Sequence, residues 1–505
     1  MPSQIDAFVR ELAGELGPDA VAADPTTLER YGETTLPGGP RTPGCVVYPG
    51  STADVQRVVR AAAKHGVPLY PVSTGNNIGL GSRAPVRAGH AVLDLGRRMN
   101  RILEVDEALG IAVVEPGVSF QMLHDELVRR GDTLMVSATS GPPHGGILGN
   151  ALDKGGGYGP YFDHFGMLCG MEVVLGNGEV IRTGDGSLEA DTLPNFHASK
   201  YSFGPILDGL SALATFAIVP RAGVWLTPRP PHVESFHFLY EHDDDLAEIV
   251  DRVRPLKMSN FVPTLFRVSN DVYAASGEAR NPEYVPGTKA ALSDEGRRAL
   301  RKKAGLGAWQ VSGAFYGPNA AAVAPQVERR KAHFGAGGKA PFVPRAEAMR
   351  TPPLKPSADA MSGRPGIGEL GMLDWRPGGG NAWFLPGTPM VGRLALELDH
   401  LARGIYAAHG MDFMVMHVAS ARFARGLHVL SWNRGDADEN ARADACYRAL
   451  AQAFAARGVG VGRAPLDWQG LHAGLLMPGF RDAVNAIKHA LDPKGIIAPG
   501  KYGIE

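Results

Sequence analysis

The chain contains 505 residues and carries a formal net charge of −1 at pH 7. This balance gives no overall field that would favour nucleic acid or an anionic membrane surface as a partner. The length predicts two or three domains, or one domain with a large insertion, and 44% hydrophobic residues are enough for a large core. The three cysteines, Cys45, Cys169 and Cys446, are too few for a disulfide framework and lack a metal-binding spacing, so we predict no metal site.

The first residues, MPSQIDAFVRELAGELG, predict an amphipathic helix with acidic side chains. This segment lacks the basic and apolar regions of a signal peptide, and the sequence contains no apolar run of membrane-spanning length. We therefore expect a cytoplasmic protein without a membrane partner.

Residues 43–72 predict a strand, a helix and a second strand. GCVVYPG is a short apolar strand, and Ser51 with Asp54 forms a helix-capping pattern. Apolar residues then recur at helical spacing until Gly66, and VPLYPVS returns as a strand. A loop rich in glycine and asparagine, STGNNIGLG, begins at Ser73.

This glycine loop can bring several backbone N–H groups close to an anion. It is not a P-loop, because no GK[ST] follows it. It is also a poor dinucleotide fingerprint, since the residues after it do not predict the helix that such a motif opens. On its own the loop is either a phosphate-binding turn or simply a turn.

Further along the chain, hairpins are predicted at 101–118 and 171–184, the second around an Asn177-Gly178 turn. Residues 119–131 predict a helix between them. Strands and helices alternate over residues 232–335, and the Gly/Pro-rich segment 335–368 predicts a long loop. The remainder predicts helices and strands and ends in a helix with a Gly/Pro-rich exit.

Several ordered motifs together resemble one family. They are STGNNIGLG, EPGV, GILGNALDKGGGYGPYFDHFGM, MEVVLGNGEVIRTG and LDPKGIIAPGKYG. This series resembles the vanillyl-alcohol oxidase and p-cresol methylhydroxylase flavoproteins, including bacterial eugenol oxidase. The resemblance implies an α+β fold with an FAD-binding domain in two parts, 1–225 and 465–505. An α+β cap domain, 226–464, would be inserted between them and would hold the substrate.

The resemblance also implies which residues hold FAD. In the family, the backbone amides of the glycine loop bind the pyrophosphate, which carries over to Ser73, Thr74, Gly75, Asn76, Asn77 and Gly79. Residues along the flavin would be Pro116, Gly117, Gly145, Gly149, Asn150, Ile218 and Arg463, with Lys501 near the cofactor.

Two departures concern covalent attachment of the flavin. Some relatives link FAD to a histidine in a segment like W-x-P-x-G-G-H, and here Asn381 occupies that position. Others use a tyrosine in a segment like G-L-D-Y, and here Phe413 replaces it. Neither side chain can form the link, so we expect non-covalent FAD and a weaker oxidant.

Two further departures concern the substrate. The relatives hold a phenolate between two tyrosines and an arginine, and the matching positions here are Leu80, Gly462 and Arg463. The arginine alone matches, and it can stabilise negative charge on the flavin or on a substrate oxygen. The alternative is a solvated loop arginine. The relatives' aspartate near the flavin aligns with Ser140 or Gly141.

Other candidates are less specific. His144 is either a catalytic base or a structural histidine, and His417 either contacts substrate or belongs to the core. Tyr158 and Trp383 are expected as walls of the substrate pocket, together with Leu80, Asn381, Phe413 and Gly462.

These observations predict an FAD-dependent oxidoreductase. It would take a hydride from a benzylic or allylic carbon of a phenolic or other aromatic substrate, in a hydroxylation or a cyclisation. Oxygen or an electron-transfer protein would accept the electrons, and the protein would be a homodimer. The alternatives are an oxidase or dehydrogenase of a non-phenolic alcohol or hydroxy acid, or a flavin-binding protein without redox turnover.

Overall fold

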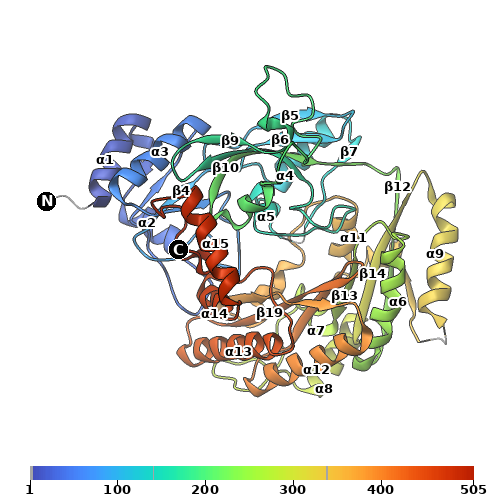
Figure 1. Cartoon of the computed structure of the whole chain (residues 1–505). Coiled ribbons are helices and arrows are strands. Elements are labelled where there is room, and N and C mark those ends of the chain that lie inside the picture. Colours follow the sequence, from blue (N-terminus) through green and yellow to red (C-terminus); the bar gives the residue numbers. More distant parts are fainter. Residues whose placement is uncertain (1–3, 140, 337–338) are drawn as a thin grey trace.

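The computed structural model describes residues 4–139, 141–336 and 339–505, and its mixture of helices and sheets confirms the predicted α+β class (Figure 1). A first sheet has the order β1-β2-β4-β3. Its strands are β1 (Val21–Ala22), β2 (Cys45–Val47), β4 (Ala91–Asp94) and β3 (Leu69–Val72). Helices α1 (Gln4–Leu16) and α3 (Thr52–His65) pack together beside it.

The predicted strand–helix–strand unit is confirmed as β2, α3 and β3. Ser51 caps α3 by accepting from the Asp54 N–H at 3.1 Å, and Gly66 ends it with a left-handed φ of 66°. β2 and β3 both run parallel to β4, which lies between them. The glycine loop therefore leaves the carboxyl end of a buried parallel strand, where ligands of such sheets usually bind.

A second, antiparallel sheet has the order β5-β6-β10-β8-β9 and contains both predicted hairpins. Its strands are β5 (Ile102–Asp106), β6 (Ile111–Val114), β10 (Ala217–Trp225), β8 (Leu168–Leu175) and β9 (Val180–Arg182). The predicted helix between the hairpins is α4 (Phe120–Arg129), capped by Ser119. The short helix α5 (Ile147–Leu152) follows β7 (Leu134–Met135) and lies on the route back to this sheet.

The third sheet has eight strands, and all its pairings are antiparallel. In sheet order these are β15 (Phe342–Pro344), β12 (His232–Tyr240), β14 (Trp309–Gly317), β13 (Phe266–Asn270), β18 (Met414–Ala419), β19 (Phe423–Asn433) and β16 (Gly379–Phe384), with β17 (Gly387–Pro389) beside β19.

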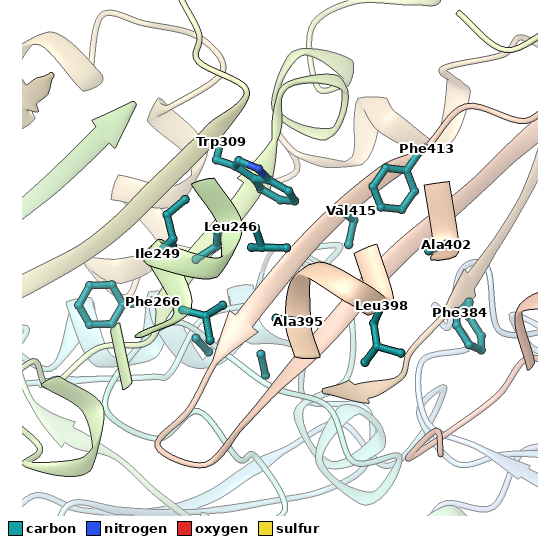
Figure 2. Close-up of a cluster of buried hydrophobic side chains, with 14 of the residues drawn as sticks. Leu246, Ile249, Phe266, Trp309, Phe384, Ala395, Leu398, Ala402, Phe413 and Val415 are labelled. Atoms are coloured by element: carbon teal, nitrogen blue, oxygen red, sulfur yellow. The ribbon is translucent and has the colours of Figure 1, made fainter. Parts of the chain in front are cut away.

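Helices cover one face of this third sheet. They are α6 (Leu246–Met258), α9 (Ala320–Phe334), α12 (Gly392–Ala408) and α13 (Ala437–Ala455). Figure 2 shows Ile249 of α6 and Leu398 of α12 in one apolar cluster. Trp309 of β14, Val415 of β18 and Phe413, just before β18, belong to the same cluster. Because helices fill this face, the cavity that reaches the sheet lies on its other face, where Val418 and Leu427 line it.

The prediction of a long loop over residues 335–368 is wrong. This segment contains β15 and two helices, α10 (Arg345–Ala348) and α11 (Lys355–Met361). Proline is favourable in the first turn of a helix, and Pro356 occupies that place in α11. A Gly/Pro-rich composition is therefore compatible with a short strand and two short helices.

The C-terminal segment returns to the first two sheets after α15 (Pro478–Leu491) (Figure 1). Leu69 of β3 donates to the Ile496 carbonyl and accepts from Ala498, both at 2.7 Å. Lys488 is buried and donates to the Thr215 carbonyl at 2.6 Å and to Asp492 at 2.7 Å. The domain boundaries 1–225, 226–464 and 465–505 stay a prediction. No helix in the described ranges combines the length and apolarity needed to cross a membrane.

Candidate active site

A groove of about 140 Å³ runs along the glycine loop, which we call the cofactor groove. Its walls come from the loop after β3, the turn into α5, β10 and the C-terminal segment. Among its lining residues are ten of the predicted cofactor residues: Ser73, Gly75, Asn76, Asn77, Pro116, Gly145, Gly149, Asn150, Ile218 and Lys501. Positions that are far apart in the sequence thus meet on one surface.

Glycines keep this groove open. A Cβ on Gly149 would lie 2.0 Å from the Ser73 Oγ, and one on Gly146 would lie 2.7 Å from the same atom. Gly75 has a φ of +69°, which side chains disfavour. The loop therefore approaches the start of α5 closely, and a groove lined by glycines and small polar residues fits a pyrophosphate.

A cation lies in the groove as well. Lys501 is buried, and its Nζ lies 5.2 Å from the centre of the Tyr70 ring. Burial lowers the pKa of Lys501, and Asp153 opposes this effect. The glycine-lined cofactor groove and the buried Lys501 together fit an anionic dinucleotide.

Three predicted cofactor residues support the groove without lining it. Thr74 accepts from the Gly146 N–H at 2.9 Å through its Oγ1. A Cβ on Gly117 would lie 2.3 Å from the Gly96 carbonyl oxygen, so this glycine allows two turns to pack together. Gly79 contacts the third sheet.

At Gly79 the glycine loop meets β16. Trp383 donates from its Nε1 to the Ile78 carbonyl at 3.0 Å and from its backbone N–H to the Gly79 carbonyl at 3.3 Å. A Cβ on Gly79 would lie 2.5 Å from Trp383 Cδ1, and the φ of Gly79 is +73°. This glycine joins the loop to the sheet that carries the substrate side.

Replacing Gly79 by alanine is expected to lower the flavin content and the thermal midpoint, because the Cβ both strains the backbone by about 1–3 kcal/mol and collides with Trp383. Gly39→Ala is the matched control, since Gly39 has a φ of +77° and a Cβ there would meet no atom within 4 Å. The ratio of flavin to protein absorbance and a melting curve measure both variants. Equal effects would contradict a role for the Trp383 contact.

A second and larger cavity of about 460 Å³ adjoins the groove, and we call it the substrate cavity. The two share lining residues, namely Asn76, Asn77, Thr139, Gly141, Pro142 and Asn150. Besides these shared residues, four more of the site residues predicted from the sequence line the substrate cavity: Leu80, Tyr158, Trp383 and Arg463. Most of its other walls are apolar and include Leu265, Met372, Val418 and Leu427. A ligand there would lie beside whatever the groove holds.

Cationic side chains gather in the substrate cavity. Arg463 contacts Asp153 through Nη1, at 3.2 Å from its carbonyl oxygen and 3.3 Å from Oδ2. Asp153 also accepts from Asn77 at 3.1 Å, which ties Arg463 to the glycine loop. Arg425 and Lys154 line the same cavity. Burial lowers the pKa of Lys154 and of Arg425, and a neighbouring arginine lowers each pKa further.

A tyrosine pair lies on another part of the wall. Tyr158 and Tyr273 both line the cavity, and Tyr158 donates to Glu369 at 3.4 Å. Glu369 forms a buried ion pair with Arg267 at 2.6 Å, and that guanidinium lies 5.1 Å from the Tyr158 ring centre. Burial, followed by the charge of Glu369, raises the pKa of Tyr273. The Tyr273 phenol is therefore neutral, and both rings offer flat surfaces against which an aromatic ring can pack.

His417 and Phe413 lie on the wrong side of the sheet for contact with substrate. Side chains alternate along β18, so that Val418 lines the cavity and His417 faces the helix-covered side. There His417 packs 5.9 Å from the Trp309 ring, and burial lowers its pKa to about 4. Phe413 packs against Tyr406 of α12 at 5.4 Å, within the cluster of Figure 2. We assign neither residue a catalytic or substrate-binding role.

His144 and Asn381 line neither cavity. The side chain of His144 is exposed, and its carbonyl accepts from Asn76 at 3.0 Å, which is a supporting contact. Asn381 is buried beside Gly79, and its backbone accepts from Thr35 at 3.0 Å. Gly462 does not line the cavity either but lies against Arg425. Of the positions aligned with the family's aspartate, Gly141 lines both cavities, whereas Ser140 lies outside the described residues.

Sequence reasoning missed Arg425, Lys154 and Tyr273. Arg425 is the single charged residue in the apolar strand FARGLHVLSW. A charge in such a strand is a recognisable signal, because charged side chains are rarely buried unless they have a partner. Lys154 lies inside the glycine-rich motif GILGNALDKGGGYGPYFDHFGM, where it is the one cation. Tyr273 gave no signal, since α7 (Asp271–Ser276) places it through tertiary packing.

The chain resembles known flavoproteins over its whole length. Residues 43–184 match the family model described as an FAD binding domain. The chain is 34% identical to the flavoprotein subunit of 4-cresol dehydrogenase (hydroxylating) from Pseudomonas putida, over 99% of this chain and 96% of that one. It is 31% identical to 1'-carboxy-chondrochloren decarboxylase from Chondromyces crocatus, over 96% and 95% of the two chains. The crystal structure of p-cresol methylhydroxylase with substrate bound matches with a TM-score of 0.95 at 33% identity, over 99% of this chain and 97% of that one.

These matches confirm the family and the fold that the ordered motifs predicted. The glycine-lined cofactor groove and Lys501 fit the FAD that the family model names. The chain belongs to the p-cresol methylhydroxylase family of FAD-dependent oxidoreductases.

Proposed function

We propose that this protein removes a hydride from a benzylic or allylic carbon of a phenolic or other aromatic substrate. The observation that carries the proposal is the apolar cavity of about 460 Å³ that shares a wall with the cofactor groove and contains Arg463. Two of the relatives are named for 4-cresol and p-cresol, which supports an aromatic substrate. Bound FAD supplies the two-electron acceptor.

The chain's own residues would act on the substrate through charge and shape. Arg463 would stabilise an anionic substrate oxygen, because an adjacent cation lowers the pKa of a phenol. Electron donation from the resulting phenolate makes hydride loss easier. Tyr158 and the apolar walls would hold the ring and exclude water. The oxidised product would then take up water or close onto an internal nucleophile.

We also propose that FAD is bound without a covalent link. Asn381 cannot form the link, and Phe413 packs on the far face of the sheet. Acid precipitation of the purified yellow protein is expected to release the flavin into the supernatant. Colour that stays with the precipitate would contradict this proposal. As a control, a relative with a covalent flavin should keep its colour in the pellet under the same conditions.

We also propose an electron acceptor, a cellular location and an oligomeric state. One relative is named a flavoprotein subunit, which supports an electron-transfer protein as the acceptor, with oxygen as the alternative. Cys45, Cys169 and Cys446 are all buried and unpaired, which supports the cytoplasm. We keep the homodimer as a proposal by analogy.

Anaerobic mixing tests the function. Loss of the flavin's visible absorbance with 4-methylphenol or another alkyl-substituted aromatic is the expected result. Reduction only by 2-hydroxy acids or non-aromatic alcohols would favour the alternative in which Arg463 binds a carboxylate of such a substrate. No reduction by any of these compounds would favour a flavin-binding protein without turnover.

A further inference from the structure

Arg425 is a half-buried cation without a close counter-ion: in the described structure the carboxylate of Asp163, in the same cavity, attracts it only from beyond ion-pair distance. Arg425 donates from Nη1 to the Lys154 carbonyl at 3.0 Å. Among the described residues, no carboxylate oxygen lies within 4.0 Å of its guanidinium. A charge held away from water in this way is costly unless a ligand of opposite charge joins it.

The backbone around Arg425 fixes its direction. Gly426 donates to the Pro386 carbonyl at 2.9 Å, and Val461 pairs with the same Pro386. A Cβ on Gly462 would lie 3.1 Å from Arg425 Nη2 and 3.4 Å from its Cζ. The Arg425 guanidinium therefore lies directly against the segment that carries Arg463, in the space that a side chain at position 462 would need.

The charges lining the cavity do not balance. Among the described residues its charged members are Lys154, Arg425 and Arg463, against the single carboxylate of Asp163. Asp153 approaches from the groove side and pairs with Arg463. Even with both carboxylates counted, a positive excess remains, and Arg463 Nε is buried without a hydrogen-bond partner in the described structure.

We propose that Arg425 and Arg463 form a two-guanidinium clamp for a carboxylate group on the aromatic substrate. This inference rests on the proposed function, because it concerns the same cavity and names the class of substrate. Two guanidinium forks match the two oxygens of a carboxylate better than the single oxygen of a phenolate. A carboxylic acid with a pKa near 4 is also ionised at pH 7, whereas a phenol with a pKa near 10 must first lose its proton.

Calorimetric titration of the FAD-loaded protein at pH 7 tests the clamp. The probes are 4-methylbenzoate, its neutral methyl ester and 4-methylphenol. We expect the acid to bind at least about tenfold more tightly than the ester, because hydrogen bonds between two charged groups are the strong ones. Equal binding of acid and ester, or no measurable binding of the acid at millimolar concentration, would overturn the proposal.

Variants separate the clamp from general effects of charge. Arg425→Gln is expected to weaken binding of 4-methylbenzoate about 10- to 100-fold and to leave the ester unchanged. Arg425→Lys keeps the charge without the fork and should fall between, which also covers the case that the glutamine variant does not fold. Arg422→Gln is the matched control, because Arg422 is exposed, close to Arg425 in the chain, and lines neither cavity. Unchanged binding of the acid by both Arg425 variants would rule the clamp out.

Gly462→Tyr supplies a gain-of-function test. The ring would need the space that Arg425 fills, so the arginine should be displaced. We expect weaker binding of 4-methylbenzoate and tighter binding of 4-methylphenol. The clamp and the proposed function can fail separately. If alkylphenols reduce the flavin but the protein binds acid and ester equally, only the clamp is contradicted. If the protein binds the acid through Arg425 but no aromatic compound reduces its flavin, only the proposed function is contradicted.

Discussion

Arg463→Ala is expected to lower kcat/KM by about 10²- to 10³-fold while FAD stays bound, which is the effect of losing one preorganised group that stabilises developing charge. Arg463 lines the substrate cavity and does not line the cofactor groove. Its contacts to Asp153 at 3.2 and 3.3 Å hold it at the junction of the two. Stopped-flow reduction of the flavin by 4-methylphenol measures the loss, because its phenolate donates electrons to the benzylic carbon.

The split between kcat and KM identifies the role of Arg463. If the guanidinium only binds substrate, KM rises and the limiting rate of flavin reduction is unchanged. If it stabilises charge that develops during hydride loss, the limiting rate falls. Arg463→Lys should recover part of the rate, since it restores the charge without the fork. The control is Arg457→Gln, an exposed arginine on the same segment, and a loss of rate equal to that of Arg463→Ala would contradict a specific role.

Local chemistry explains why the cofactor side could be predicted from the sequence. Ser51, Gly66 and the glycines of the loop act through their own capping and φ preferences, so their meaning can be read without knowing their neighbours. The order of the motifs then identified the family. The resemblance to that family then supplied the ten predicted cofactor residues that line one groove, which local sequence alone did not assign.

The substrate side depends on register and long-range packing, which the sequence does not reveal. His417 and Val418 are neighbours in β18, yet only Val418 lines the cavity, because successive side chains of a strand point to opposite faces. Arg425 reaches Gly462 only because β19 and the segment after α13 both meet Pro386. A motif comparison can note that Gly462 departs from the family's tyrosine, but the structure is needed to see Arg425 in that space.

Asp412→Ala is expected to destabilise the part of the protein around the substrate cavity by about 3–5 kcal/mol, because it leaves a buried guanidinium without its counter-ion. Asp412 Oδ2 accepts from Arg376 Nε at 2.8 Å, from Trp375 Nε1 at 2.9 Å and from Asn281 at 3.0 Å. Arg376 has 0% exposure, so water cannot replace the lost carboxylate. Urea unfolding followed by tryptophan fluorescence measures the change.

The same substitution connects stability to the cavity wall. Met372 and Leu373 line the cavity just before Trp375, so loosening the Asp412 network should also weaken ligand binding. Asp374→Asn is the matched control: Asp374 pairs with Arg280, but their side chains are 43% and 66% exposed. An exposed pair contributes about 0–1 kcal/mol, so this variant should unfold near the wild-type urea concentration. If both variants unfold at the same urea concentration, the buried network around Asp412 does not stabilise this wall of the cavity. The packing of Trp375 and Met372 must then stabilise it instead.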